Sequence, residues 1–361
     1  MTTVSIVAGP RLHLAQRIRE VAANTPAAYF GIVLGLSGLG GAWRAAALAW
    51  HLPTVVGEAV YVLAGAVWAV LVVLYALKAV LAPDKLAVEA AHAVQCCFIG
   101  LAGVATMLVA SGLIPYSAGA ATVLFGLGFL FTLGFAVWRT GGLWQGGRDH
   151  GTTTAVLYLP TVAGSFVSAT GASALGYQDW GQLAFGAGLF SWLAMESVLL
   201  HRLLTGPEKP VALRPTLGIQ LAPAPVGAVA YLSVGGGAPD LFAHALIGYG
   251  LLQVLVLARL SPWIAKAGAV PGLWAFSFGA TAMATAPVRL VAHGDAGAVA
   301  VLAPVLFLAA NGLVVGLTIM TVALLLQGKM FAAPTAASQA RTRPRPQSSR
   351  QVTRRLLSKG C

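Results

Sequence analysis

The feature that most constrains the fold of this chain is a series of ten long apolar segments separated by short polar ones. Each segment reaches the roughly 20 residues that a helix needs to cross a bilayer. Only 9% of the 361 residues are charged, whereas soluble domains carry roughly 25%. We therefore expect an all-α membrane protein with ten transmembrane helices, over residues 27–49, 54–81, 91–113, 117–139, 153–175, 182–204, 216–236, 240–262, 271–292 and 298–327.

The distribution of basic residues supports this count. All but two of the 22 Lys and Arg lie in the terminal arms or around the loops after the second, fourth, sixth and eighth segments. The exceptions are Arg44 and Arg289, and the intervening loops carry acids such as Asp240. This positive-inside pattern predicts a multi-pass protein of the bacterial cytoplasmic (inner) membrane with both termini in the cytoplasm. It also accounts for the net charge of +12 without a nucleic acid partner.

Three regions are predicted along the chain. Residues 1–25 form a cytoplasmic N-terminal arm without the apolar stretch of a signal peptide, so the first segment is expected to be retained. Residues 26–327 form the transmembrane domain. Residues 328–361 form a basic cytoplasmic tail rich in Pro, Ser and Arg, a composition typical of disorder.

The odd-numbered segments begin about 60 residues apart, as expected for repeated helical hairpins. They are also richer in Gly and Pro than most even segments, with Pro160 in the fifth and Pro223 in the seventh. Such residues in a spanning helix are tolerated best where the helix packs against protein or faces water. We expect five hairpins around a central pore, with the odd helices inside and the even helices facing lipid.

The ninth segment contains two aromatic residues, Phe276 and Phe278, beside Gly279, and small residues follow them. This composition suits a helix that lines a narrow path, where the glycine leaves a ring room to swing. It equally suits a helix that packs through small residues against its neighbours. The segment by itself leaves both interpretations open.

Three motifs occur in order along the chain: Tyr29-Phe-Gly-Ile-Val-Leu-Gly-Leu-Ser-Gly-Leu-Gly-Gly-Ala-Trp-Arg44, Leu213-Arg-Pro-Thr-Leu-Gly-Ile-Gln-Leu-Ala-Pro-Ala-Pro-Val-Gly227 and Trp274-Ala-Phe-Ser-Phe-Gly279. With these motifs, residues 25–327 resemble the tellurite-resistance/dicarboxylate transporter family. Its bacterial members are TehA-like, and its plant members are the slow-type anion channels of guard cells.

The resemblance implies ten helices as five hairpins in a quasi-fivefold arrangement around a pore, usually in a homotrimer. It implies passive flow of small inorganic or carboxylate anions and a pore gate on the ninth helix. That gate aligns with Phe278, with Phe276 as the neighbouring alternative. Phe166 resembles a second pore-lining aromatic residue. The remaining candidates for the pore wall are Phe98, Phe30, Gly279 and Pro223.

Charged residues within the segments are further candidates. Arg44 and Arg289 lie at the outer ends of odd segments, where they would form an anion vestibule or extend their charges to the membrane interface. Glu196 is expected in a structural ion pair with the nearby His201 and Arg202, and Glu58 is expected to reach water. Hydroxyls, helix ends and the amides of Gln95 or Gln220 would stabilise an anion weakly.

These patterns favour a passive anion channel or channel-like transporter, TehA-like and associated with tellurite resistance. The alternative is a proton-coupled exporter of C4-dicarboxylates, sulfite or another oxyanion, with Glu196 as its titratable group. No nucleotide-binding loop, dinucleotide fingerprint or catalytic triad occurs, and the cysteines lack metal or redox spacing. We therefore expect no enzyme activity, no cofactor and no metal site; the expected partners are anions, membrane lipid and further copies of the chain.

Overall fold

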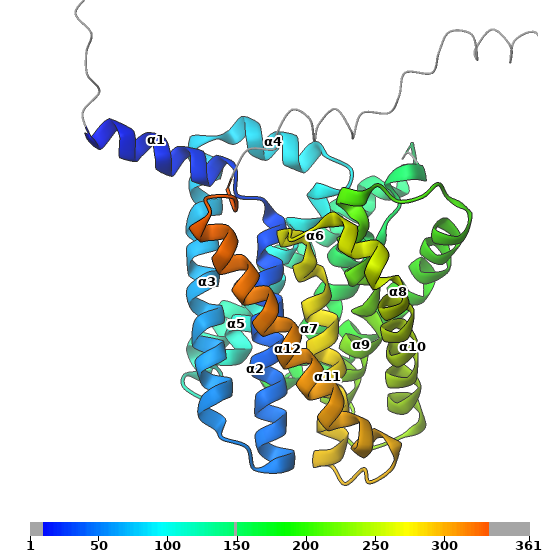
Figure 1. The fold of residues 1–361 in the computed structure, drawn as a ribbon. Coiled ribbons are helices and arrows are strands. Elements are labelled where there is room, and N and C mark those ends of the chain that lie inside the picture. Colours follow the sequence, from blue (N-terminus) through cyan, green and yellow to red (C-terminus); the bar gives the residue numbers. More distant parts are fainter. Residues whose placement is uncertain (1–9, 148–149, 332–361) are drawn as a thin grey trace, which may run out of the picture.

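The computed structural model describes residues 10–147 and 150–331, and within them the chain forms helices and no strand. Ten helical segments are long and apolar enough to cross a membrane, as predicted. Figure 1 shows them side by side in one bundle, with α1 (Pro10–Ala23) and α4 (Pro83–Ala91) across one end. We call that end the basic side, because the loops with Lys209 and Lys266 also lie there. The predicted tail beyond residue 331 lies outside the described residues.

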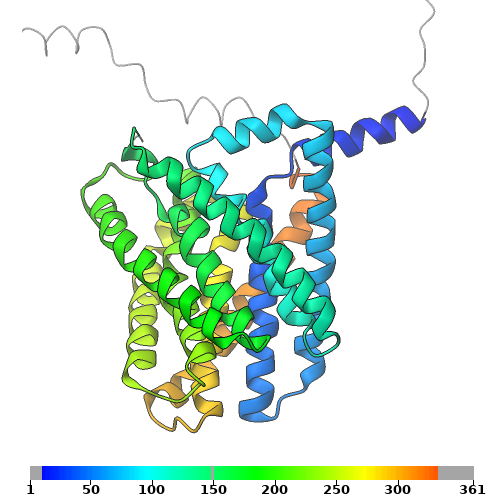
Figure 2. The same cartoon turned by 180° about the vertical axis from the view of Figure 1, so that it is seen from behind.

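The even-numbered spans are long α-helices. They comprise α3 (Thr54–Leu81), α6 (Ala118–Trp144), α8 (Gln178–Thr205), α10 (Leu241–Ile264) and α12 (Ala298–Leu326). Figure 2 shows α6 and α8 on the near side of the molecule when it is viewed from behind. The predicted span limits agree with the observed ones to within about five residues, a normal uncertainty for helix ends.

Each odd-numbered span begins, on the basic side, with a short 3-10 or π segment and continues as an α-helix. The proline ring removes a backbone donor and disfavours a regular α-helix, which explains this conformation around Pro160 and Pro215. The short segments are η1 (Ala27–Tyr29), η2 (Gln95–Phe98), η4 (Ala155–Leu157) with the π-helix η5 (Leu159–Ala163), η6 (Val211–Leu221) and η8 (Pro271–Phe276). The α-helices that follow are α2 (Phe30–Trp50), α5 (Leu101–Leu113), α7 (Gly164–Ala174), α9 (Pro223–Val234) and α11 (Ser277–Ala292).

The odd and even spans differ in burial. Between 61% and 78% of the residues in an 18-residue apolar stretch of each odd span are buried, against 11% to 33% in the even spans. Each inner helix contacts the next, in the order α2, α5, α7, α9 and α11, and α11 contacts α2. The odd spans therefore form the interior of the bundle, while their quasi-fivefold regularity remains a prediction.

Small residues allow the last contact, between α11 and α2. A Cβ atom added at Gly35 would lie 2.3 Å from the Ser277 hydroxyl oxygen, and one at Gly38 would lie 2.2 Å from that of Thr281. Side chains larger than hydrogen at these two positions would force the helices apart. Packing by small residues, which the sequence left as one interpretation of the ninth segment, therefore occurs on this face of α11.

The charged region around Lys78 and Glu89 differs from the loop expected there. Lys78 lies in the last turn of α3 and Glu89 lies in α4, and their side chains form a buried ion pair at 2.5 Å. Glu89 also accepts a hydrogen bond of 2.8 Å from the backbone N–H of Ala27, at the start of the first span. Burial of both charges depends on this pairing, so the region fastens α4 to the bundle.

Candidate functional site

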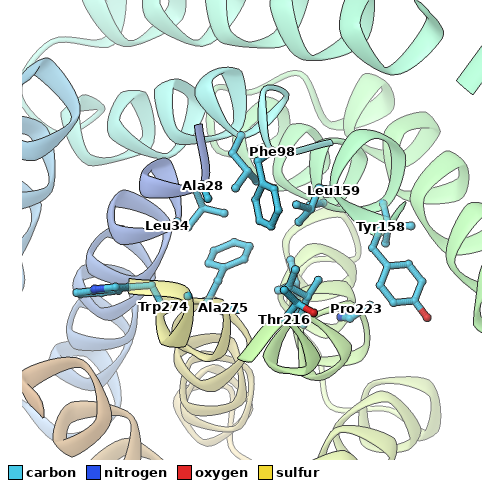
Figure 3. A pocket seen from close by; sticks show the side chains of 18 of the residues that line it. Ala28, Leu34, Phe98, Tyr158, Leu159, Thr216, Pro223, Trp274 and Ala275 are labelled. Carbon is cyan, nitrogen blue, oxygen red and sulfur yellow. The ribbon is translucent and has the colours of Figure 1, made fainter. Parts of the chain in front are cut away.

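A cavity of about 110 Å³ lies among the inner spans toward the basic side. Its wall takes residues from all five odd spans, and no charged side chain is among them. Figure 3 shows the ring of Phe98 pointing into this space and the hydroxyl of Tyr158 pointing away from it. Of the predicted pore-lining residues, Phe98, Phe166 and Pro223 contribute to the wall.

A second cavity, of about 510 Å³, lies among the α-helical parts of the same five spans, toward the opposite side. Its wall includes Arg44, Arg289 and His293 and contains no Asp or Glu. Hydroxyl groups of Ser37, Thr170 and other residues also line it. The opposite-side cavity is therefore the more polar of the two and carries positive charge, whereas the basic-side cavity is nearly apolar.

Phe278 lines both cavities. It is the second residue of α11, and its ring approaches α2, where a Cβ added at Gly38 would lie 3.4 Å from it. Val226 of α9 also lines both spaces, although no sequence signal singled it out. These two side chains therefore lie where the two cavities meet.

Phe276, the alternative to Phe278, lies elsewhere. Its ring packs against η6, where a Cβ added at Gly218 would lie 2.5 Å from a ring carbon, and it lines neither cavity. Residues two positions apart point about 200° apart around a helix, which explains the separation. Gly279 also lines neither cavity: it lies against Leu221 and Ala222, so its small size admits η6 rather than a swinging ring.

The other predicted aromatic residues also divide into those that line a cavity and those that pack elsewhere. Phe30 is 2% exposed, packs edge-on against Tyr75 at 5.9 Å between ring centroids, and lines neither cavity. Phe166 is fully buried, and its ring fits between Gly188 and Gly227, where added Cβ atoms would lie 2.7 and 3.1 Å from it. Phe166 is thus held firmly, because backbone lies close on both of its sides.

The two arginines of the opposite-side cavity have different partners. Arg289 donates from Nη1 to the Ser233 hydroxyl at 2.8 Å and to the Val229 carbonyl at 3.5 Å. Among the residues that the structure describes, no acceptor is found for its Nε and Nη2 groups, and it forms no ion pair. Arg289 therefore brings an uncompensated positive charge with free donors to the cavity.

Arg44 is held by an acidic partner and by two backbone carbonyls. Its Nε and Nη2 donate to the two carboxylate oxygens of Glu58 at 2.7 Å each, and its other bonds go to the carbonyls of Ser111 and Gly112. Its guanidinium also lies 4.2 Å from the centre of the Tyr61 ring. The Glu58 side chain is 26% exposed, so it reaches water as expected, but it also pairs with Arg44. This bidentate pair joins α2, α3 and α5.

The expected ion pair of Glu196 with His201 and Arg202 is wrong. The carboxylate of Glu196, 9% exposed, accepts hydrogen bonds from Trp192 at 2.9 Å, from Gln220 at 3.0 Å, and from the hydroxyls of Tyr158 and Tyr249. These donors come from four elements that converge in space. Gln220 is therefore turned toward Glu196, and neither Gln220 nor Gln95 lines either cavity.

Comparison with known proteins decides the family. The family model of the voltage-dependent anion channel (SLAC1) matches residues 24–322. The chain belongs to the voltage-dependent anion channel family. It is also 38% identical over 308 residues to a protein of Haemophilus influenzae described as a tellurite resistance protein TehA homolog, which covers 85% of this chain and 92% of that protein.

Membership of the voltage-dependent anion channel family confirms the resemblance inferred from the three sequence motifs. It makes the chain a multi-pass membrane protein of a channel or transporter family. The matched region contains all five odd spans and both cavities. Within residues 10–147 and 150–331, no group of three or more His, Cys, Asp or Glu side chains is suited to hold a metal ion.

Proposed function

We propose that this protein is a passive anion channel, or a channel-like transporter, of the bacterial cytoplasmic membrane, with both termini in the cytoplasm. Small inorganic or carboxylate anions would cross through the two cavities in series. The Phe278 ring would close the path between them, and a change in its rotamer or in α11 would open it. Phe166, Phe98 and Pro223 would form the wall on the basic side of this gate.

The observation that carries the proposal is the position of Phe278, whose side chain lines both cavities. One aromatic ring between two such cavities would be a steric barrier that also excludes water. Arg289 supports anions as the permeant species, because a positive charge at a pore mouth raises the local anion concentration. The absence of carboxylates from that cavity wall leaves this charge uncompensated.

The name of the Haemophilus relative and the resemblance to the family suggest the permeant anions and the assembly that we propose. The Haemophilus protein is described as a tellurite resistance protein, so we include tellurite among the oxyanions that this protein would carry. The mostly apolar lining of the basic-side cavity would bind an anion weakly, which suits passage of several kinds of anion rather than tight binding of one. We further propose a homotrimer in which each copy has its own path.

Electrophysiology with purified protein in lipid bilayers tests the proposal. With chloride on one side and nitrate, tellurite or succinate on the other, the reversal potential is expected to follow the anion gradients and to ignore a change of cation. Phe278→Ala provides the conducting form if the wild type stays closed. A cation-selective current, or no current from correctly reconstituted Phe278→Ala protein, would contradict the proposal.

The same preparation distinguishes a passive channel from a proton-coupled exporter. The observation that keeps this alternative open is Glu196, a buried carboxylate within a span. A coupled exporter would accumulate a dicarboxylate or sulfite against its gradient when a pH gradient is imposed. A passive channel is expected to dissipate the anion gradient at a rate that an imposed pH gradient leaves unchanged.

A further inference from the structure

Glu196 lies at the centre of a hydrogen-bond cluster behind the wall of the basic-side cavity. Its four donors come from the start of the fifth span (Tyr158), from η6 (Gln220), from α10 (Tyr249) and from α8 itself (Trp192). All four are neutral side chains. Among the described residues, Glu196 forms no ion pair.

The bonding pattern is that of a carboxylate anion, because each partner donates to it. Trp192 and the Gln220 amide nitrogen can only donate, and together they donate to both carboxylate oxygens. The hydroxyls of Tyr158 and Tyr249 donate to the carboxylate as well. Neutral donors satisfy the hydrogen-bonding capacity of the anion but leave its charge unbalanced. In a low-dielectric interior such a charge acts over a longer range than it would in water.

One phenol ring separates this charge from the basic-side cavity. Tyr158 lines the cavity with its ring, while its hydroxyl points out of the cavity and donates to Glu196 (Figure 3). The cavity wall itself has no charged residue. On the other side of Phe278, Arg289 supplies the opposite charge.

We propose that Glu196 is an electrostatic positioning residue that makes anion flow through this protein directional. Its charge lowers the anion occupancy of the basic-side cavity, while Arg289 raises the occupancy of the opposite-side cavity. Anions therefore pass more readily from the opposite side to the basic side than in reverse under equal and opposite driving forces. This inference rests on the proposed anion conduction and adds its rectification.

Excised patches from oocytes that express Phe278→Ala test the inference, because all copies then share one orientation. In symmetric, low-salt anion solutions, current carried by anions entering from the opposite side should exceed the reverse current. Adding Glu196→Gln should raise the reverse current about three- to tenfold, as expected when one unit charge is removed from beside a low-dielectric cavity. Adding Arg289→Gln should instead lower the larger current.

Two control variants and one alternative test separate the effect of charge from that of packing. The current ratio is the current carried by anions that enter from the opposite side, divided by the reverse current. Asp179→Asn removes an exposed carboxylate from the far end of the same helix and should leave this ratio unchanged. Tyr249→Phe removes one donor but keeps the charge, and should also leave it unchanged. If Glu196→Gln fails to fold, Tyr249→Lys keeps Glu196 and places an ammonium beside it; the ratio should then move toward one.

The outcomes distinguish this inference from the proposed function. If anion current flows and neither Glu196→Gln nor, where that variant fails to fold, Tyr249→Lys changes the current ratio, the role of Glu196 is overturned and the proposed channel stands. A ratio that shifts equally in Asp179→Asn overturns it as well. Absence of anion current from folded Phe278→Ala protein at the cell surface overturns the proposed function itself.

Discussion

At the scale of single residues, Arg44 and Arg289 show how partners decide what a charge can do. Both line the opposite-side cavity, and both were candidates either for one anion vestibule or for charges that extend to the membrane interface. Glu58 neutralises Arg44 with two bonds, and two backbone carbonyls accept two more of its donors. Arg289 binds only a hydroxyl and a carbonyl, so it keeps its charge for the cavity.

Neutralising the two arginines should therefore give different results. Arg289→Gln is expected to lower anion conductance several-fold at low salt, with a smaller effect near 1 M salt, where the Debye length is about 3 Å. Arg44→Gln should leave conductance largely unchanged and lower the free energy of unfolding by about 1–3 kcal/mol, because it leaves carbonyls and Glu58 without their donor. Conductance at two salt concentrations and thermal unfolding in detergent measure both effects; the reverse assignment would contradict this account.

At the scale of elements, close approach of backbone positions the gate segment. Gly218 of η6 lies against Phe276 of η8: an added Cβ would lie 2.5 Å from the Phe276 ring and 2.6 Å from its backbone nitrogen. Gly279 admits η6 to α11 in the same way, next to Phe278. The two short helices therefore fix where α11 begins, and with it the depth of Phe278.

Gly218→Ala should separate η6 from η8. We expect a loss of about 1–3 kcal/mol in stability, typical of an inserted methyl group in a packed interior, measured as a lower thermal midpoint in detergent. Gly248→Ala, on the exposed face of α10 with nothing within 4 Å of an added Cβ, is the matched control and should be neutral or stabilising. Equal midpoints for the two variants would contradict the close packing.

The start of α10 offers a test that depends on pH. Asp240 accepts a hydrogen bond of 2.8 Å from the Ala243 N–H, and this bond, followed by one from Tyr231, lowers the pKa of the Asp240 carboxyl. Because the pKa is lower in the folded state, the carboxylate stabilises the protein at pH values above its unfolded-state pKa of about 3.9. This stabilisation disappears as the pH falls through the folded-state pKa.

Asp240→Ala should therefore cost about 1 kcal/mol at neutral pH, as is usual for the loss of a helix cap. The difference in thermal midpoint between wild type and variant should shrink as the pH is lowered below about 4. Unfolding curves at a series of pH values measure it. A difference that stays constant down to pH 3 would show that the carboxylate does not stabilise this helix.

At the scale of the whole molecule, much of the fold was predictable. Apolar length gave the ten spans, and the Gly and Pro bias gave the inner helices, because both properties are local in sequence. The direction in which each side chain points was not predictable. Phe30 and Phe98 both lie on odd spans, yet only Phe98 lines a cavity. The 3-10 and π segments break the 3.6-residue period, so a pore-facing stripe could not be counted along the chain.

The Glu196 cluster was beyond sequence reasoning for a different reason. Three of its donors lie 24, 38 and 53 residues away along the chain. Only packing of separate spans brings Gln220, Tyr158 and Tyr249 together, while among the described residues no ion pair joins Glu196 to His201 or Arg202. Proximity along the chain therefore suggested an ion pair that the structure does not contain.

The central claim, that one ring closes a path through the whole molecule, is tested most directly by comparing anion currents of Phe278→Ala and Phe276→Ala at matched surface expression. Phe278→Ala is expected to raise the current at least about tenfold over wild type, which corresponds to a barrier lower by roughly 1.4 kcal/mol. Phe276→Ala should stay near the wild-type current, because Phe276 packs against Gly218 outside both cavities. An unchanged current in Phe278→Ala, or an equal rise in both variants, would contradict the claim.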